Sequence, residues 1–529
     1  MLDRDQLAKA IRFEGGLNRR LFLNYSAALS TLPFLPATGI ASTRPSFSKN
    51  PFSLGVASGD PNSSSVVLWT RLAPNPNDAD GGMPDTPTEV RWELANDESM
   101  KTIIAEGKTL SRPRLGHSVH VEAKGLKPNR WYWYRFHCGD ATSPIGRTRT
   151  MPADDSNPEQ IRFAFASCQH FEQGLYTAYE HMAHQPIDMV FHLGDYIYEY
   201  EAGRGGKVRT HLGKETKSLD DYRGRYAQYR QDPLLQGMHA QCPWFVTWDD
   251  HEFDNNYADA ISEEIQVDPA DFLKRRAAAY QAYYEMMPLR ESSLPQGPNM
   301  QLFRQAKFGQ LAKFYILDTR QYRTDQPNND KKSPINEAAL DQHNSMLGSD
   351  QRTWLKYHLD SMPARWNVLA QQVMMGMVGF PKEESPLLYS MDQWPGYSHE
   401  RMELMQWIHD KRIPNPVVLT GDIHSHWANE LRIDDRDPKS PIVATEFVGS
   451  SISSGGNGQD KPKGLDQLMA ANPGVKFHNQ QRGYVLCSVT NKTWESEYIV
   501  VDQVTNPGGT CSTRAKFVIE AGNPYLHQA

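Results

Sequence analysis

The sequence lacks several features that would point directly to a common class of protein. Beyond the N-terminus, no segment approaches the roughly 20 consecutive apolar residues of a membrane-spanning helix. There is no Gly-rich loop to cradle a phosphate, and no G-x-S-x-G elbow, which argues against a serine hydrolase. No repeat or low-complexity tract stands out. The 529-residue chain is therefore expected to be a soluble globular protein of two or three domains.

An excess of positive charge is missing as well. Lys and Arg number 56 against 63 Asp and Glu, which gives a formal net charge of -7. An acidic chain is a poor bulk nucleic-acid binder, because phosphate backbones need a basic face. Any phosphate that the protein handles should therefore meet metal ions, or a few arginines in a pocket.

The N-terminal segment is typical of an export signal. Arg19 and Arg20 precede a weakly apolar stretch that ends near the small residues Gly39 and Ala41. This pattern resembles a twin-arginine signal peptide, so we predict a signal over residues 1–41, a partnership with the twin-arginine machinery, and a periplasmic or secreted location. Ser, Thr and Pro interrupt the apolar stretch, so no permanent membrane span is expected. The alternative is a surface helix that happens to carry two arginines.

The rest of the chain divides into a β-rich segment and a mixed one. Residues 42–150 hold short alternating runs such as SVVLWTRL and NRWYWYRFHCG between turn-forming clusters, which favours an N-terminal β-sandwich. Over residues 155–505, strand-like runs such as IRFAFAS and NPVVLTGD alternate with helical stretches, which indicates an α/β domain. Residues 506–529 form a predicted C-terminal extension, and the protein is expected to be a monomer.

Four of the strand-like runs end in residues that bind metals. The endings are ASCQH, LGDYIYEY, TWDDHEFDNNYA and LTGDIHSHWANE. Because the carboxyl ends of α/β strands converge on one crevice, we expect the four endings to meet. A single Gly-Asp after a strand is often only a turn or a helix cap, and Asp-Asp-His-Glu is sometimes a solvated loop. Four such endings together favour a metal site.

The residue types indicate which metals the crevice would hold. A thiol, a phenol three residues after a carboxylate and an imidazole favour a transition metal, with iron first. The surplus of Asp and Asn oxygens favours hard cations such as calcium beside it. A mixed centre of this kind suits phosphoester hydrolysis, because it can polarise the phosphoryl oxygens and lower the pKa of a bound water.

Taken in order, these motifs resemble those of a known enzyme family. The order strand-Cys, GDYIY, WDDHE…NN and GDIH is similar to the PhoD-type alkaline phosphatases, relatives of the purple acid phosphatases among the calcineurin-like metallophosphoesterases. The phrases YRGRYAQYRQDP, ILDTRQYRTD and WNVLAQQVMM support the resemblance, which runs from about residue 51 to about residue 501. The β-sandwich is included, and its phrase GLKPNRWYWYRF is similar to fibronectin-type domains.

The resemblance implies both a fold and an activity. The fold would be a four-layer αββα metallophosphoesterase domain preceded by the β-sandwich. The cofactors would be Fe³⁺ and two Ca²⁺ ions. The activity would be hydrolysis of phosphate mono- and diesters by a metal-activated hydroxide outside the cytoplasm, for phosphate scavenging.

Carried over residue by residue, the resemblance gives an iron shell of four side chains. Cys168 stands where relatives use a carboxylate and would bind the iron. Asp195 would bridge the iron and the first calcium, Tyr198 would supply a phenolate, and His424 would close the shell. With Cys168 on the metal, the remaining four cysteines could form two disulfides. Cys487 with Cys511 is the preferred pair, because they flank adjacent strand-like runs.

The remaining assignments concern calcium and the substrate. Asp250 and Asp422 would be carboxylate ligands of calcium. His251 follows Asp250 and is the expected acid or hydrogen-bond donor to phosphate. Asn255 and Asn256 are candidates for contact with phosphate or the second calcium.

Other polar residues and functions stay open. Three histidines are expected to pack around the site: His170, His192 and His426. Three arginines could clamp phosphate or serve only the fold: Arg225, Arg230 and Arg320. Either Gln371 or Gln372 falls where relatives have a further metal-side ligand. The rival functions are a non-catalytic calcium-binding surface protein and a nuclease or lipid phosphodiesterase on the same fold.

Overall fold

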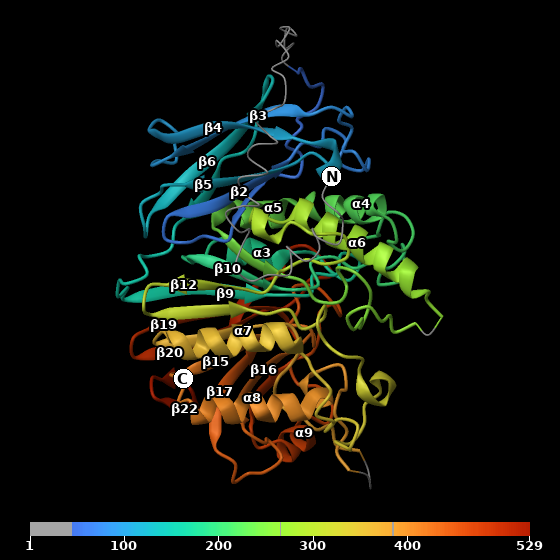
Figure 1. Cartoon of the computed structure of the whole chain (residues 1–529), viewed down its shortest axis with the longest axis vertical. Helices are drawn as coiled ribbons and strands as arrows, with labels where there is room; N and C mark the ends of the chain where they lie inside the picture. The colour runs from blue at the N-terminus through green and yellow to red at the C-terminus, as the bar shows by residue number, and fades with distance from the viewer. Residues whose placement is uncertain (1–44, 265, 383–385) are drawn as a thin grey trace, which may run out of the picture. The chain divides into compact units, whose positions relative to one another are not determined.

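The structure, a computed structural model, describes residues 45–264, 266–382 and 386–529. The predicted signal with Arg19 and Arg20 lies outside the described residues. The described part is mixed α/β with three sheets, which confirms the α/β class expected from the sequence (Figure 1). None of its helices combines the length and the apolar character needed to cross a bilayer.

The largest sheet has ten strands. Three of the four strand endings with metal-binding residue types, here called the metal-type endings, follow strands of this sheet. In spatial order its strands are β22 (Asn523–Gln528), β21 (Cys511–Glu520), β20 (Thr493–Val501), β19 (Arg482–Thr490), β9 (Gln160–Ala166), β10 (Met189–Leu193), β11 (Trp244–Thr247), β1 (Val56–Gly59), β2 (Ser65–Arg71) and β5 (Ser118–Lys124). Strands β9, β10 and β11 run parallel, so the loops that follow them leave the same edge. The predicted C-terminal extension belongs to this sheet as β21 and β22.

The second large sheet supplies the fourth ending. Its order is β12 (Arg304–Phe308), β13 (Ala312–Ile316), β14 (Trp366–Ala370), β15 (Pro416–Thr420), β17 (Ile442–Val448), β16 (His426–Arg432) and β18 (Val475–Asn479). A buried cluster joins the two large sheets, with Phe163 and Phe191 from the first against Phe314 from the second. Aromatic pairing of this kind fixes how the sheets face one another and so sets the distance between their loops.

Helices cover the outer faces of both large sheets. Helices α3 (Thr177–Met182), α4 (Leu219–Arg230), α5 (Pro233–Gln241) and α6 (Pro269–Met286) pack on the ten-stranded sheet. Helices α7 (Gly348–Ser361) and α8 (Ser398–Asp410) pack on the seven-stranded sheet, where Figure 1 draws them in yellow and orange beside β15 to β17. Helix α9 (Leu465–Ala471) lies near β18. Short 3₁₀ turns complete the helical elements: Pro113–Leu115, Glu291–Ser293, Pro327–Asp330 and Trp394–Tyr397.

The N-terminal strands are shared between two sheets. Strands β4 (Ile103–Ser111), β3 (Thr88–Ala95), β6 (Trp131–Cys138), β7 (Ala141–Thr142) and β8 (Gly146–Arg149) form a separate five-stranded sheet. Strands β1, β2 and β5 instead continue the ten-stranded sheet, because β1 pairs in parallel with β11 at Gly59 and Trp244. Gly59 permits this junction, since a Cβ there would lie 2.5 Å from the carbonyl oxygen of Pro288.

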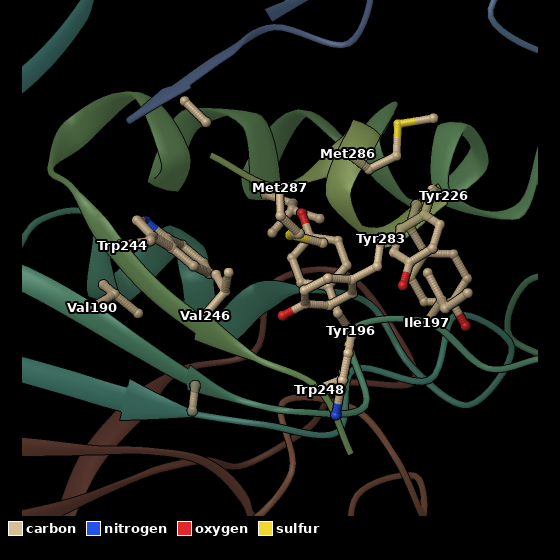
Figure 2. Packing of buried hydrophobic residues seen from close by; sticks show 14 of the residues in the cluster. Val190, Tyr196, Ile197, Tyr226, Trp244, Val246, Trp248, Tyr283, Met286 and Met287 are labelled. Atoms are coloured by element: carbon tan, nitrogen blue, oxygen red, sulfur yellow. The ribbon is translucent and has the colours of Figure 1, made fainter. Parts of the chain in front are cut away.

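A buried aromatic cluster supports the loops that carry the metal-type residues (Figure 2). Tyr283 and Met287 at the end of α6 pack over β10 and β11. Tyr196, which follows Asp195, and Trp248, which precedes Asp249, lie in the same cluster. The backbone of the metal-type loops is thus held by the core of the domain.

The predicted disulfide between Cys487 and Cys511 is wrong. All five cysteines are free thiols in the structure. Cys487 on β19 faces Ser496 of β20, whereas Cys511 on β21 faces Val501 at the far end of the same strand. Five residues along a strand separate the two positions by roughly 17 Å, beyond the reach of a disulfide.

Candidate metal centre and active site

The predicted ligands sit on backbone that is unusual for residues with side chains. Cys168, Asp195, Asp422 and His424 all have positive φ values, of 58°, 56°, 62° and 53°. A left-handed conformation costs a non-glycine residue on the order of 1 kcal/mol or more, and such positions cluster at functional sites. The three strand-end turns that carry these residues, after β9, β10 and β15, are therefore held in strained conformations by the surrounding fold.

The first cluster brings together the four side chains expected to bind iron. One donor atom each from Cys168, Asp195 and His424 lies within 4.8 Å of the others. The Tyr198 hydroxyl donates to Asp195 Oδ2 at 2.6 Å and lies 3.1 Å from His424 Nε2. Asp195 Oδ1 is buried without a hydrogen-bond partner among the described residues. A buried, unpartnered carboxylate oxygen beside a thiol and an imidazole is suited to a cation.

The second cluster is formed by carboxylates. Asp249, Asp250 and Asp422 each bring an oxygen within 4.8 Å of the others, and Asp250 also meets Asp195 and His251 in this way. Asp195 is therefore common to two groups, which places it between the clusters. The arrangement could hold a chain of cations with Asp195 as the bridge.

The two asparagine candidates occupy different positions. The Asn256 backbone N–H donates to Asp250 Oδ2 at 2.8 Å, and its side-chain amide donates to Asp330 Oδ2 at 2.5 Å. Asn256 therefore borders the carboxylate cluster. The Asn255 side chain instead donates to Glu263 at 2.8 Å on the exposed rim.

Arg320 lies closer to the proposed ligands than either of the other two candidate arginines. Its guanidinium is fully buried, donates to Asp249 and, at 3.1 Å, to Asp422, and lies 3.7 Å from Asp250. Its remaining terminal nitrogen donates to Asp392 at 2.8 Å. The sequence could not separate Arg320 from other arginines, because only the fold brings it under the carboxylate cluster.

The other two arginines serve the fold. Arg225 donates to four backbone carbonyls of the loop after β10, those of Tyr198, Tyr200, Leu212 and Lys214. Arg230 donates to the Tyr196 hydroxyl at 3.1 Å and lies over the Trp69 ring. Both positions stabilise the loop that carries Asp195 and Tyr198.

His251 lies at the site with a carboxylate partner. Its Nδ1 is 2.8 Å from Glu199 Oε2, and its ring centroid is 4.2 Å from that of Tyr198. Burial by itself lowers the pKa of His251, but the carboxylates of Glu199, Asp250 and Asp195 outweigh it and raise the pKa well above its usual value. Nothing in the sequence pattern singles out Glu199, although it lies in the same strand ending as Asp195.

The remaining polar candidates take part in packing. The His170 ring lies 4.2 Å from that of Tyr198, His192 is buried between Tyr196 and Trp244, and His426 Nδ1 accepts from the Ser450 backbone N–H. These placements agree with the packing role expected for them.

Neither of the two glutamines points to the metal-type clusters. The Gln371 amide donates to Thr420 and Val373, and the Gln372 amide donates to Thr247 and Leu317. Gln393, which the sequence did not suggest, donates to Asp422 Oδ2 at 2.9 Å.

The electrostatics of the crevice favour cations. Burial raises the pKa of Asp195 and of Asp249 well above the usual value, and it raises that of Asp422 to about 7 despite the attraction of Arg320. Burial and the nearby Asp195 also raise the pKa of the Cys168 thiol well above its usual value. These groups ionise readily only when a positive charge joins them, so the donor set fits a metal centre.

Comparison with known proteins identifies the family to which this chain belongs. The family model described as PhoD-like phosphatase matches residues 163–498, and the model of its N-terminal domain matches residues 39–152. The chain belongs to the PhoD-like phosphatase family. It is therefore a phosphoric ester hydrolase, and the resemblance stated from the sequence motifs is confirmed.

Two relatives of this PhoD-like phosphatase cover most of its length. It is 52% identical over 480 residues to alkaline phosphatase D of Bacillus subtilis (strain 168), covering 90% of this chain and 82% of that protein. A solved structure described as the structure of PhoD is 51% identical, with a TM-score of 0.89, and covers 92% of this chain and 93% of that chain. The alkaline phosphatase activity predicted from the sequence agrees with both.

Proposed function

We propose that this enzyme is a metal-dependent phosphatase and phosphodiesterase that uses one Fe³⁺ and two Ca²⁺ ions. The observation that carries the proposal is the meeting of a thiol, a phenol and an imidazole with buried carboxylates of raised pKa at one set of strand ends. Soft and phenolic donors suit iron, whereas carboxylate oxygens suit calcium. When bound, the metal ions would polarise the phosphoryl oxygens and activate the water nucleophile.

The side chains divide this work between them. Cys168, Asp195, Tyr198 and His424 would hold the iron, and Ser454, which donates to the Tyr198 hydroxyl at 2.8 Å, would orient the phenol. This assignment follows the first cluster of donor atoms. The strained turns that present the ligands would keep the shell in place before metal arrives.

The carboxylate cluster would hold calcium. Asp195, Asp250 and Asp422 would be the ligands, with Asn256 at the border for the second ion or the phosphate. Asn255 remains a weaker candidate at the rim. Arg320 would limit the repulsion among the carboxylates from below.

His251 is proposed to act on the substrate. Because Nδ1 is engaged by Glu199, Nε2 is the nitrogen left to donate a hydrogen bond to a bound phosphate. The Glu199 carboxylate beside Nδ1 favours the protonated ring, so His251 could place a proton near the leaving oxygen. Glu199 fixes the orientation of the ring.

The proposed four-layer αββα order rests on the positions of the buried clusters. One cluster lies between the two large sheets, and two others lie between each sheet and its helices. The fibronectin-like character of the N-terminal strands is proposed on their phrase GLKPNRWYWYRF. Domain limits at 42–150, 155–505 and 506–529 remain proposals, and β1 crosses the first of them by pairing with β11.

Export and phosphate scavenging complete the proposal. The Arg19-Arg20 pair supports passage of the folded protein through the twin-arginine route to the periplasm or the medium. Replacement of both arginines by lysine should retain the protein in the cytoplasm, which fractionation would measure. Unchanged export would remove this part of the proposal and leave the enzymatic part intact.

The enzymatic part is tested with a pair of esters. The purified protein is assayed on p-nitrophenyl phosphate and on bis(p-nitrophenyl) phosphate, and its iron and calcium are measured by elemental analysis. Hydrolysis of both esters by protein that contains iron and calcium supports the proposal. Inactivity on both would favour the non-catalytic calcium-binding alternative, and activity on the diester alone would favour a phosphodiesterase.

A further inference from the structure

A cavity lies directly beside the proposed metal centre. Its volume is about 440 Å³, which is within the usual range for small-molecule sites. The walls come from the segments around residues 332, 380–381, 390–393, 423–427, 462–468 and 478–480. Figure 1 places α9, which contributes to one wall, at the end of the seven-stranded sheet.

Two side-chain arrangements connect this cavity to the ligands. Ile423 and Ser425 line the cavity and flank His424. Gln393 also lines it, and its amide donates to Asp422 Oδ2 at 2.9 Å. A group attached to a phosphate at the metal centre could therefore extend into the cavity without a change in the fold.

The described side chains of the cavity carry positive charge, whereas those of the proposed metal centre carry negative charge. Among the residues that the structure describes, the lining of the cavity contains two lysines, Lys332 and Lys463, and no carboxylate. Neither lysine forms an ion pair with an acidic residue in the described part of the chain. Lys332 Nζ lies 4.1 Å from the centre of the Phe380 ring, so one positive charge is held over an aromatic face.

The rest of the lining offers apolar and aromatic surface. Ile423, Leu465 and Leu468 line the cavity together with Trp427, whose ring lies 3.9 Å from that of His478. Such surface favours a ring or another apolar body, whereas the lysines favour an anion.

We propose that this cavity binds the leaving group of the substrate and selects esters whose leaving group combines a ring or apolar body with a negative charge of its own. The inference rests on the proposed hydrolysis at the metal centre, since it names the class of substrate for that site. Phosphate would lie at the metal-type ligands, the ring against Phe380 and Ile423, and the second anion between Lys332 and Lys463. An acidic protein would otherwise repel such a substrate, and the two lysines offset this locally.

The test compares two esters that differ only in charge. The holoenzyme is assayed on 4-carboxyphenyl phosphate and 4-carbamoylphenyl phosphate, and the ratio of their kcat/KM values is measured for the wild type. The same ratio is measured for a Lys332→Gln, Lys463→Gln double variant. Lys331→Gln with Lys461→Gln is the matched control, because these exposed neighbours do not line the cavity.

The wild type should prefer the charged ester. In the double variant the kcat/KM ratio of the two esters should fall roughly three- to tenfold, through a higher KM for the charged ester. This is the scale expected for the loss of two partly exposed ion pairs. The control variant should keep the wild-type ratio. Equal kcat/KM for the two esters in the wild type, or an unchanged ratio in the double variant, would overturn the proposal.

A binding measurement separates this proposal from the proposed function. Calorimetric titration with 4-hydroxybenzoate and 4-hydroxybenzamide reports on the cavity without turnover. Tighter binding of the benzoate, lost in the double variant, supports the cavity even if neither ester is hydrolysed, in which case the proposed hydrolysis fails alone. Equal affinity for the two compounds refutes the leaving-group site even if both esters are hydrolysed.

Discussion

The buried carboxylates of the proposed metal centre and the buried Glu93 of the N-terminal five-stranded sheet have different surroundings. In the sheet, Glu93 accepts from Arg135 at 2.8 Å, pairs with Arg91 and lies 3.1 Å from His137. Burial alone raises the pKa of Glu93, but the hydrogen bonds from Arg135 and His137 outweigh it and lower the pKa to about 2. The protein itself therefore supplies the positive charge that this carboxylate needs.

The crevice has the opposite balance. Arg320 faces Asp249, Asp250 and Asp422 together. Burial still raises the pKa values of Asp249 and Asp422, and only that of Asp250 is lowered, because Arg320 and His251 outweigh its burial. The missing positive charge is what a metal ion would bring, because a cation lowers the pKa of the carboxylates that bind it. The difference teaches that the Glu93 cluster serves the fold, whereas the crevice carries negative charge that the protein does not neutralise.

The largest effect should come from removal of the thiol that is proposed to bind iron. Cys168→Ala removes the soft donor, so the variant should lose iron, visible absorption and activity together. Since removal of a residue that only orients a ligand costs about 10- to 100-fold in affinity or activity, removal of a ligand should leave less than about 1% of wild-type turnover. Metal analysis, an absorption spectrum and phosphatase assays measure the three losses.

The control for this variant is Cys511→Ser. Cys511 is the first residue of β21, the second strand of the ten-stranded sheet, and belongs to none of the candidate metal-binding groups of the described residues. Its variant should keep iron, colour and activity. A colourless, iron-free but fully active wild type would remove Cys168 from the metal centre.

Removal of calcium from the proposed carboxylate site should reversibly abolish activity and lower stability. Treatment with a calcium chelator should abolish turnover and lower the apparent Tm, because Asp195, Asp250 and Asp422 would again repel one another without compensation. A ligand at a hundredfold excess over its Kd stabilises the folded state by about 2.7 kcal/mol, which sets the scale of the shift. Added calcium should restore both quantities. Full activity in calcium-free buffer, with no calcium in the elemental analysis, would contradict this prediction.

The ligand positions were accessible from the sequence because each one ends a recognisable strand. Cys168 follows IRFAFA, and Asp422 follows PVVLT, so local pattern and the rule for parallel strands were enough to bring them together. Arg320 also follows a strand, β13, but its role depends on the packing of one sheet against the other. The contact between Glu199 and His251 likewise depends on the fold, because the two residues lie on different loops.

Other features could not be predicted from the sequence at all. The junction of β1 with β11 rests on a single parallel pair between segments 185 residues apart, Gly59 and Trp244. The pairing of Cys487 with Cys511 was expected because the two residues flank adjacent strand-like runs, and it is wrong. The register of β19, β20 and β21 separates them instead, and register depends on tertiary contacts.

A smaller effect is expected from His251, which is proposed to bind substrate and no metal. His251→Ala should lower kcat by roughly 10²- to 10⁴-fold, the usual scale for a positioned acid or base. Iron and calcium contents should stay near wild type, which separates this variant from Cys168→Ala. Glu199→Gln keeps the shape of the partner and should lower kcat less. A near-normal kcat in His251→Ala would exclude the ring from the reaction.

The smallest effect is expected from Glu93 in the N-terminal five-stranded sheet, and it should change stability without changing activity. The folded-state pKa of Glu93, about 2, is below the usual unfolded value of about 4.3, so its contribution to stability is present above about pH 4 and is lost as the pH falls toward 2. Glu93→Gln should therefore reduce the free energy of unfolding by about 1 kcal/mol at pH 7, and the difference from wild type should shrink in more acidic buffer. Urea unfolding at several pH values measures it, and kcat and metal content should not change. Lost metal in this variant would mean that the two regions are coupled, and an unchanged stability at pH 7 would mean that Arg91 and Arg135 do not stabilise the carboxylate as the geometry indicates.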